Sequence, residues 1–264
     1  MGDQMQILYF EVHSFTDEVF HGNPAGVCPL EEWLDDEMML KIAAENGLSE
    51  TAFFVAREGF YELRWFTPTT EVDLCGHATL ATAFVLFEHL GYDAEAIRFE
   101  TKSGALQVGR LGASLIMDFP SRPGEGCSAP DHLASGLGIP VKEVYKSRDY
   151  LVVLPDEDVV RALDPDFSEL LQVDALGIIV TAPGDDVDFV SRFFAPRAGV
   201  NEDPVTGSAH CTLAPYWAER LEKKDLSARQ VSERGGELAC RIVEDRVHIA
   251  GHAVLYFKGV LSVE

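Results

Sequence analysis

One stretch of the chain is apolar nearly all the way round, a pattern typical of a helix that is buried on all sides, and a second stretch is small and apolar at first. The first covers residues 77–90 and reads HATLATAFVLFEHL; it ends at Gly91, a residue that often follows a helix C-terminus. The second covers residues 208–221 and reads SAHCTLAPYWAERL. It becomes amphipathic in its last turns and contains Pro215, which can kink a helix. We expect one largely buried helix in each half of the chain.

Most of the remaining chain alternates short apolar runs with turn residues, which predicts strands. Surface helices are expected over residues 34–45 and 131–137. Strands that wrap a central helix would form a barrel-like half. The expected strands are residues 6–14, 51–56, 62–66, 96–101, 104–108, 113–119, 150–154, 175–181, 189–194, 236–243, 246–250 and 253–259.

One pentapeptide pattern occurs twice in the chain. Residues 64–68 read RWFTP and residues 192–196 read RFFAP, an offset of 128 residues in a chain of 264. Each copy leads through an acidic stretch to a glycine, Gly76 or Gly207, that opens one of the two apolar stretches. The same features in the same order indicate a duplication.

The duplication predicts two similar halves. We place the first at residues 1–118, completed by a C-terminal strand at 254–264, and the second at residues 119–253. The segment 120–130 is rich in Pro, Gly and Ser and is the best candidate for a linker. The predicted fold class is α+β, with two pseudo-symmetric β-barrel-like halves that each wrap a central helix. Two such halves would leave one cleft between them.

The charge balance limits the partners that this chain can have. It carries 44 acidic and 21 basic residues, a formal net charge of −23. Such a surface repels phosphate backbones, so we expect no nucleic-acid partner. No apolar stretch is long enough to span a membrane, and the amino terminus lacks the pattern of a secretory signal. We therefore expect a cytoplasmic protein without a membrane partner.

The cysteines and the short motifs give no sign of a metal or a nucleotide. The five cysteines are widely and irregularly spaced and form no C-x-x-C pair, which fits a reducing compartment. The chain has no H-E-x-x-H cluster, no G-x-G-x-x-G and no phosphate-binding loop of the G-x-x-x-x-G-K-[ST] type. We expect neither a metal nor a dinucleotide. The cysteines are Cys28, Cys75, Cys127, Cys211 and Cys240.

A glycine at the start of a buried helix exposes backbone N–H groups at the positive end of the helix dipole. Such a terminus stabilises a carboxylate or a developing oxyanion. Gly76 and Gly207 therefore suit a small anionic substrate held between the halves. For either glycine alone, close packing of the helix against a strand is a sufficient explanation. The repetition favours the anion.

Glu50 is the candidate acid/base. It follows Gly47, Leu48 and Ser49 and begins an apolar run, so burial is expected to raise the pKa of its carboxyl towards the range of a proton-transfer group. An exposed glutamate at a strand end is the alternative interpretation.

Three further polar residues stand beside turns or helix starts. His77 and Asp203 could relay protons or bind substrate, but a His at a helix start is more often a cap or packing residue, and an Asp before Pro is more often a turn former. Asn23 lies in the turn-forming segment His21-Gly22-Asn23-Pro24, and turn formation alone could account for it.

Several of these segments together resemble the PhzF family of phenazine-biosynthesis-like isomerases, which belongs to the diaminopimelate epimerase fold. The resemblance covers essentially the whole chain and implies two similar β-barrel-like halves with the active site between them. The matching segments are residues 15–16, 22–27, 48–53, 63–81 (which contain Cys75-Gly76-His77-Ala78-Thr79) and 201–210 (Asn-Glu-Asp-Pro-Val-Thr-Gly-Ser-Ala-His).

The resemblance implies a role for each candidate residue. Glu50 would shuttle the proton, with His77 and Asp203 as polar partners. The backbone at Gly76, Gly207 and Ser208 would hold the substrate carboxylate, and Asn23 is a further substrate-binding candidate. No cofactor and no metal are implied, and a homodimer is expected. The family is known for an isomerisation that moves a proton on an activated ring carbon in a biosynthetic process.

Three functions stay open. The first is a cofactor-independent isomerase that uses Glu50 in the interdomain cleft. The second is a racemase or epimerase that uses Glu50 and Cys75 on opposite faces of a carbon. Related epimerases carry a cysteine before each helix glycine, but this chain has Cys75 and Thr206 there, and threonine is a poor acid or base at neutral pH. The third is a catalytically silent small-molecule binder. The sequence does not identify the substrate.

Overall fold

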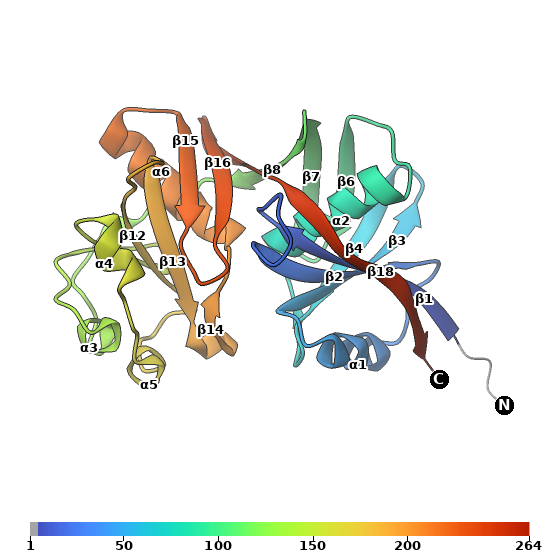
Figure 1. Cartoon of the computed structure of the whole chain (residues 1–264), viewed down its shortest axis with the longest axis horizontal. Coiled ribbons are helices and arrows are strands. Elements are labelled where there is room, and N and C mark those ends of the chain that lie inside the picture. Colours follow the sequence, from blue (N-terminus) through green and yellow to red (C-terminus); the bar gives the residue numbers. More distant parts are fainter. Residues whose placement is uncertain (1–4, 264) are drawn as a thin grey trace. The chain divides into compact units, whose positions relative to one another are not determined.

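The structure is a computed structural model that describes residues 5–263 and forms two compact units. Unit 1 contains the described residues up to Asp118 together with those from Ala250 onward, and unit 2 contains Phe119–Ile249. In each unit, strands surround one buried helix, labelled α2 in unit 1 and α6 in unit 2 (Figure 1). The predicted α+β class is confirmed.

Unit 1 is built mainly from antiparallel strands. β1 pairs antiparallel with both β18 and β2, β2 runs parallel to β3, and β3 forms a hairpin with β4. The helices are α1 (Asp36–Asn46) and α2 (Gly76–His89). The strands are β1 (Met5–Ser14), β2 (Asn23–Leu30), β3 (Glu50–Arg57), β4 (Phe60–Phe66), β5 (Glu71–Val72), β6 (Ala96–Thr101), β7 (Gly104–Leu111), β8 (Ser114–Pro120) and β18 (Ala253–Val263).

Unit 2 repeats this plan. β11 runs parallel to β12, and β12 forms a hairpin with β13. The helices are α3 (Leu133–Leu137), α4 (Glu157–Arg161), α5 (Phe167–Leu170), η1 (Pro196–Ala198), η2 (Gly207–Ala209) and α6 (His210–Leu221). The strands are β9 (Glu125–Gly126), β10 (Glu143–Lys146), β11 (Tyr150–Val153), β12 (Ile178–Pro183), β13 (Phe189–Ala195), β14 (Val200–Asp203), β15 (Asp225–Gln230), β16 (Gly236–Val243) and β17 (Arg246–Gly251).

The register of the strands confirms the predicted duplication. In each unit, four residues from four successive strands lie opposite one another in the same order, through one parallel and two antiparallel pairings. These rows are Gly26, Thr51, Phe66 and Glu71 in unit 1 and Tyr150, Ile178, Phe194 and Glu202 in unit 2.

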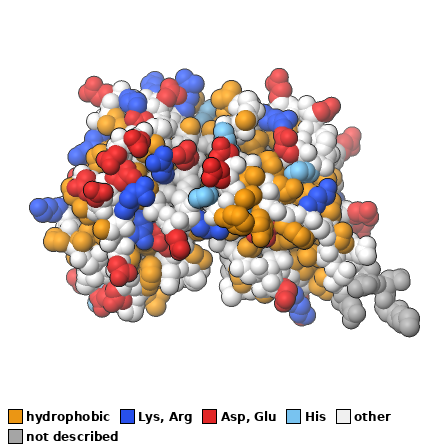
Figure 2. All heavy atoms as spheres, in the orientation of Figure 1, with side chains coloured by type: hydrophobic (Ala, Val, Ile, Leu, Met, Phe, Trp, Pro, Cys, Tyr) orange, Lys and Arg blue, Asp and Glu red, His pale blue; other side chains and the backbone are white. Residues whose placement is uncertain are grey.

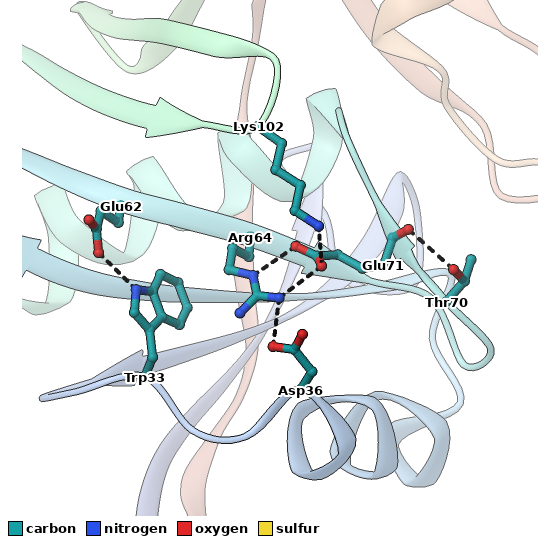
Figure 3. Close-up of polar contacts among 7 residues, drawn as sticks. All are labelled: Trp33, Asp36, Glu62, Arg64, Thr70, Glu71 and Lys102. Atoms are coloured by element: carbon teal, nitrogen blue, oxygen red, sulfur yellow. Dashed lines mark hydrogen bonds and ion pairs between the residues drawn. The ribbon is translucent and has the colours of Figure 1, made fainter.

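An arginine–glutamate pair also recurs in each unit. Arg64 Nε and Nη2 donate to the two carboxylate oxygens of Glu71 at 2.7 and 2.8 Å (Figure 3). The guanidinium also lies 5.1 Å from the Phe66 ring centroid. Arg192 makes the same paired contacts with Glu202, at 2.7 and 2.8 Å. Bidentate pairs of this kind fix geometry as well as adding energy. Each pair therefore links two neighbouring strands, β4 to β5 in unit 1 and β13 to β14 in unit 2.

Several elements differ from the sequence prediction. The first residues of β2 lie in the segment expected to be a turn because of Gly22, Pro24 and Gly26, and the acidic stretch before Gly207 is the short strand β14. The second buried helix begins with the 3₁₀ turn η2. The strands β5, β9, β10 and β15 and the helices α4 and α5 were not expected, because they are short or weakly patterned.

The segment 120–130 is hydrogen-bonded within unit 2. Ser121 N donates to Asp245 O at 2.9 Å, and Arg122 N donates to Cys211 O at 2.8 Å. The segment also contains β9, which pairs with β10. It is therefore fixed to the second unit along its length.

The described surface mixes acidic and basic side chains, as Figure 2 shows for one face. Exposed apolar side chains gather on β18, where Tyr256, Phe257 and Val260 are each about half exposed. Among residues 5–263, no helix is both long enough and apolar enough to cross a membrane. The homodimer implied by the resemblance stays a prediction.

Candidate active site

The first candidate, Glu50, is the first residue of β3. Helix α1 ends at Gly47, which has a positive φ of 63° and donates its N–H to Ala43 O at 3.2 Å. This glycine cap turns the chain into β3, where Glu50 lies opposite Ala25 of the parallel strand β2. The Glu50 side chain is 18% exposed. It is therefore shielded from bulk water but accessible.

His77 lies in the first turn of α2 and is buried. Its Nε2 lies 3.3 Å from Glu50 Oε2, and its Nδ1 lies 3.2 Å from Asn23 Nδ2. Ser14 Oγ donates to the backbone carbonyl of His77 at 2.8 Å. Ser14 and Asn23 are opposite one another in the β1–β2 ladder, so adjacent strands hold both ends of this histidine.

The imidazole of His77 is neutral at physiological pH. Burial lowers the pKa of His77 to about 3. The Asn23 amide donates to Nδ1, so the ring proton resides on Nε2, which faces Glu50. The 3.3 Å contact between His77 Nε2 and Glu50 Oε2 therefore pairs a neutral ring with the carboxylate.

The turn before Asn23 requires glycine. Gly22 has φ +67°, and a Cβ atom on it would lie 2.2 Å from the backbone oxygen of Ser14. Any side chain there would push apart the two strand ends that hold His77.

Cys75 is the N-cap residue of α2 and is buried. Its Sγ lies 3.5 Å from His77 Nδ1 and 4.0 Å from Nε2. Glu50, Cys75 and His77 each offer a ligand atom, and these atoms lie within 4.8 Å of one another, so the three could hold a metal ion. Both ring nitrogens of His77 already face Asn23 and Glu50, and a metal would have to displace one of these contacts. The absence of a metal stays a prediction.

In unit 2, Asp203 is the last residue of β14 and precedes the second helix start. Thr206 Oγ1 donates to Asp203 Oδ2 at 2.5 Å. The fully buried Gln230 fixes this connection: its Nε2 donates to Asp203 O at 2.7 Å, and its Oε1 accepts from Thr206 N at 2.9 Å. Sequence reasoning missed Gln230, because a lone glutamine on a strand has no distinctive pattern.

The two helix starts share a further contact. In α2, Thr79 Oγ1 donates to Cys75 O at 2.5 Å. At the second helix, His210 Nδ1 lies 2.9 Å from Thr206 O, one turn back along the chain. Burial lowers the pKa of His210 to about 4, so this histidine is also neutral. In both units a side chain binds the carbonyl of the residue before the glycine and fixes the first turn.

The structure thus brings five of the sequence candidates together in unit 1. They are Glu50, His77, Asn23, Gly76 and Cys75, with Ser14 as a partner that the sequence did not single out. Asp203, Gly207 and Ser208 lie around the helix start of unit 2. That the two sets serve one cleft stays a prediction.

Comparison with known proteins identifies the family. The model of the phenazine biosynthesis-like protein family (PhzC-PhzF) matches residues 12–259. The chain belongs to this family. A protein of Pseudomonas aeruginosa named as an uncharacterized isomerase is 56% identical over 259 residues, which cover 98% of this chain and all of the relative. The phenazine biosynthesis-like family is thus isomerase-like.

Solved structures agree with this assignment. A PhzF family protein of Enterococcus faecalis has a TM-score of 0.96 at 49% identity and covers 98% of this chain and 100% of its own. A hydroxyproline epimerase of Agrobacterium vitis, at 9% identity, has a TM-score of 0.64 over 98% of this chain and 93% of its own. This second likeness shows the fold alone, and it confirms the expected epimerase-like fold of the PhzC-PhzF family.

Proposed function

We propose that this protein is a cofactor-independent isomerase that moves a proton on a small carboxylate-bearing substrate, with Glu50 as the acid/base. One observation carries the proposal. Glu50, shielded but accessible, lies 3.3 Å from the Nε2 of a buried neutral histidine at a helix start. A carboxylate in such a place is suited to exchange protons with a bound molecule.

The neutrality of His77 supports this role. A positively charged partner would favour the ionised carboxylate and weaken its ability to accept a proton. A neutral imidazole beside Glu50 adds no positive charge to the site. Asn23, buried and hydrogen-bonded to Nδ1, keeps the ring in the tautomer with its proton on Nε2. We therefore assign Glu50 the proton transfer and His77 and Asn23 its orientation.

The substrate carboxylate is proposed to bind at the helix starts. The first N–H groups of a helix are free of intrahelical partners and attract anions. Gly76 opens α2 and Gly207 opens the turn that leads into α6. In this proposal the backbone at Gly76, Gly207 and Ser208 binds the carboxylate, and Asp203 is a second polar group towards the substrate.

The epimerase that uses Glu50 and Cys75 is the second candidate, because Cys75 Sγ lies 3.5 Å from His77 Nδ1. A two-thiol mechanism lacks its second thiol: Thr206 precedes Gly207 where Cys75 precedes Gly76. The Thr206 hydroxyl donates its proton to Asp203. This favours the single-carboxylate isomerase.

Proton exchange with solvent separates the three functions. The full chain is incubated in D₂O with a panel of small unsaturated and chiral carboxylic acids, and each acid is analysed by NMR. An isomerase moves a double bond and incorporates deuterium at the new C–H position. Inversion of a stereocentre with deuterium uptake would favour the epimerase. Binding of an acid without any exchange would favour the silent binder and contradict the proposal.

A further inference from the structure

The strand register identifies the position in unit 2 that corresponds to Glu50. Thr51 lies opposite Phe66 in unit 1, and Ile178 lies opposite Phe194 in unit 2. The residue before Ile178 is Gly177, so a glycine stands where unit 1 has its glutamate. A Cβ atom on Gly177 would lie 2.2 Å from the Phe193 ring and 3.0 Å from Asp149 Oδ1. The carboxylate beside this position therefore comes from Asp149.

Asp149 is buried, with 3% of its surface exposed. Its Oδ2 accepts from Arg148 Nε at 3.1 Å and lies 3.0 Å from Arg148 Nη2. Its Oδ1 is also buried and has no hydrogen-bond partner among the described residues. A buried carboxylate oxygen without a donor is unfavourable for folding and calls for a functional explanation. The contact that this carboxylate does make is with Arg148.

Arg148 reaches the start of the second buried helix. Its Nη2 lies 3.3 Å from Ser208 Oγ, and Ser208 follows Gly207 as His77 follows Gly76. The Arg148 side chain is 37% exposed, so part of the guanidinium is open to a ligand while Asp149 holds the other part. The Glu50–His77 pair of unit 1 thus has an Asp149–Arg148–Ser208 cluster as its counterpart in unit 2.

Two more arginines contribute positive charge around Cys211, which lies one turn into the same helix start. Arg122 N donates to Cys211 O at 2.8 Å. Burial raises the pKa of the Cys211 thiol to about 11, and the positive charges of Arg122, Arg148 and Arg246 oppose that rise. In a chain with 44 acidic and 21 basic residues, such a group of guanidinium charges is a local attraction for anions.

We propose that Arg148, with Ser208 and the backbone N–H groups at the start of the second helix, binds the carboxylate of a small organic acid, and that Asp149 is the positioning residue for Arg148. The planar fork of a guanidinium matches a carboxylate. Asp149 cancels part of the local charge, which favours a monoanion over a doubly charged phosphate. This inference extends the proposed function. The assignment of the ligand as an organic acid rests on that proposed function.

The test is an NMR titration of the full ¹⁵N-labelled chain with benzoate at constant ionic strength, with inorganic phosphate as a second probe. Benzoate should shift the amide signals of Gly207, Ser208 and Ala209 saturably. Arg148→Gln should weaken this binding at least 10-fold, and Arg148→Lys, which keeps the charge without the fork, should also weaken it. Arg229→Gln removes a half-buried arginine of unit 2 that pairs with Glu237 and should leave the affinity unchanged.

Asp149→Asn separates positioning from charge. If Asp149 only cancelled charge, its neutralisation would strengthen benzoate binding. If it positions Arg148, binding weakens and the Arg148 Nε–H signal exchanges faster with water. A stronger affinity in this variant would overturn the positioning role.

Three results test the anion site and separate it from the proposed role of Glu50. If Arg148→Gln folds and binds benzoate as tightly as the wild type, the proposed site is wrong. If Arg148→Gln does not fold, unchanged benzoate binding in Arg148→Lys would overturn the site instead. Tighter binding of phosphate than of benzoate would overturn the carboxylate assignment. Glu50→Gln should bind benzoate normally, so a failure of Glu50 in proton transfer and a failure of Arg148 in anion binding are distinguishable.

Discussion

Asn23 Nδ2 lies 3.2 Å from His77 Nδ1, although the two residues are 54 positions apart in the chain. This contact decides which nitrogen of the ring carries the proton, and so places the N–H on Nε2, the nitrogen that lies 3.3 Å from Glu50 Oε2. Asn23 is fully buried on the first position of β2, where only a turn was expected. A residue that looked like a turn former is therefore part of the candidate active site.

Replacement of Asn23 by alanine removes the donor to His77 Nδ1, so the ring proton should be able to occupy either nitrogen. We expect turnover to fall about 10-fold, and stability to fall by about 1 kcal/mol through the lost hydrogen bond. The ¹⁵N chemical shifts of the His77 ring give the direct readout: Nε2 protonated in the wild type, and a mixture in Asn23→Ala. Asn46→Ala, which removes a half-buried amide from Thr51 Oγ1, is the matched control and should leave the ring unchanged. A wild-type ring with its proton on Nδ1 would contradict the account.

The neutrality of His77 predicts a pH dependence of stability. The unfolded chain takes up this proton near pH 6.5, and the folded chain only near pH 3. Between these values the unfolded state binds more protons, so this contribution to stability is complete above pH 6.5 and declines as the pH falls towards 3.

Thermal unfolding measured from pH 8 to pH 5 should show this decline as a falling Tm. His77→Gln should reduce the dependence but not abolish it, because His210, with a pKa lowered to about 4, acts in the same direction. His21→Gln, at an exposed position, should have no effect. Direct titration of His77 by NMR near pH 6.5 in the folded protein would refute the assignment of a buried neutral ring.

Gly22 and Gly47 have similar positive φ values but different surroundings, so alanine variants of the two distinguish the cost of backbone strain from the cost of a steric clash. Gly22→Ala places a Cβ atom 2.2 Å from Ser14 O, whereas Gly47→Ala meets nothing within 4 Å. Both variants adopt a positive φ, which costs about 1 kcal/mol. Gly22→Ala should lose clearly more stability than Gly47→Ala in urea unfolding, and it should also lose activity, because Ser14 binds the His77 carbonyl. Equal losses would mean that the turn before Asn23 adapts without disturbing the site.

Cys75 distinguishes the isomerase from the epimerase. If Glu50 carries the proton, Cys75→Ala should retain turnover within about 10-fold, since the loss is then limited to the contact of the thiol with His77 Nδ1. If Cys75 is a second acid/base, the loss should reach the range of about 10²- to 10⁴-fold for a positioned proton-transfer group. The readout is deuterium exchange in a variant whose NMR spectrum shows the native fold.

Much of the fold followed from local patterns. The first buried helix was predictable because its residues are apolar on nearly every face, the second because its first turns are small and apolar, and the duplication because the Arg-x-Phe-x-Pro pattern recurs before a glycine helix start. Arg64 and Arg192 are the first residues of the two repeated segments, and each pairs with a glutamate. No local sequence pattern predicts these contacts.

The site was only partly predictable. Glu50 and His77 stood out through their places after a glycine cap and at a helix start. Ser14, Gln230, Arg148 and Asp149 did not, because their roles arise from contacts between segments that are distant in sequence: Ser14 with His77, and Arg148 with Ser208. Hydrophobic periodicity carries no information about such polar contacts.

The central claim is that Glu50 moves the proton, and Glu50→Gln tests it most directly. The variant keeps the shape of the side chain but cannot accept a proton, so deuterium incorporation into the substrate in D₂O should fall at least 10²- to 10⁴-fold. Ligand affinity, measured by calorimetry on the same sample, should stay close to the wild-type value, and Glu62→Gln on the neighbouring strand β4 should leave both measurements unchanged. Undiminished deuterium exchange in Glu50→Gln would contradict the account.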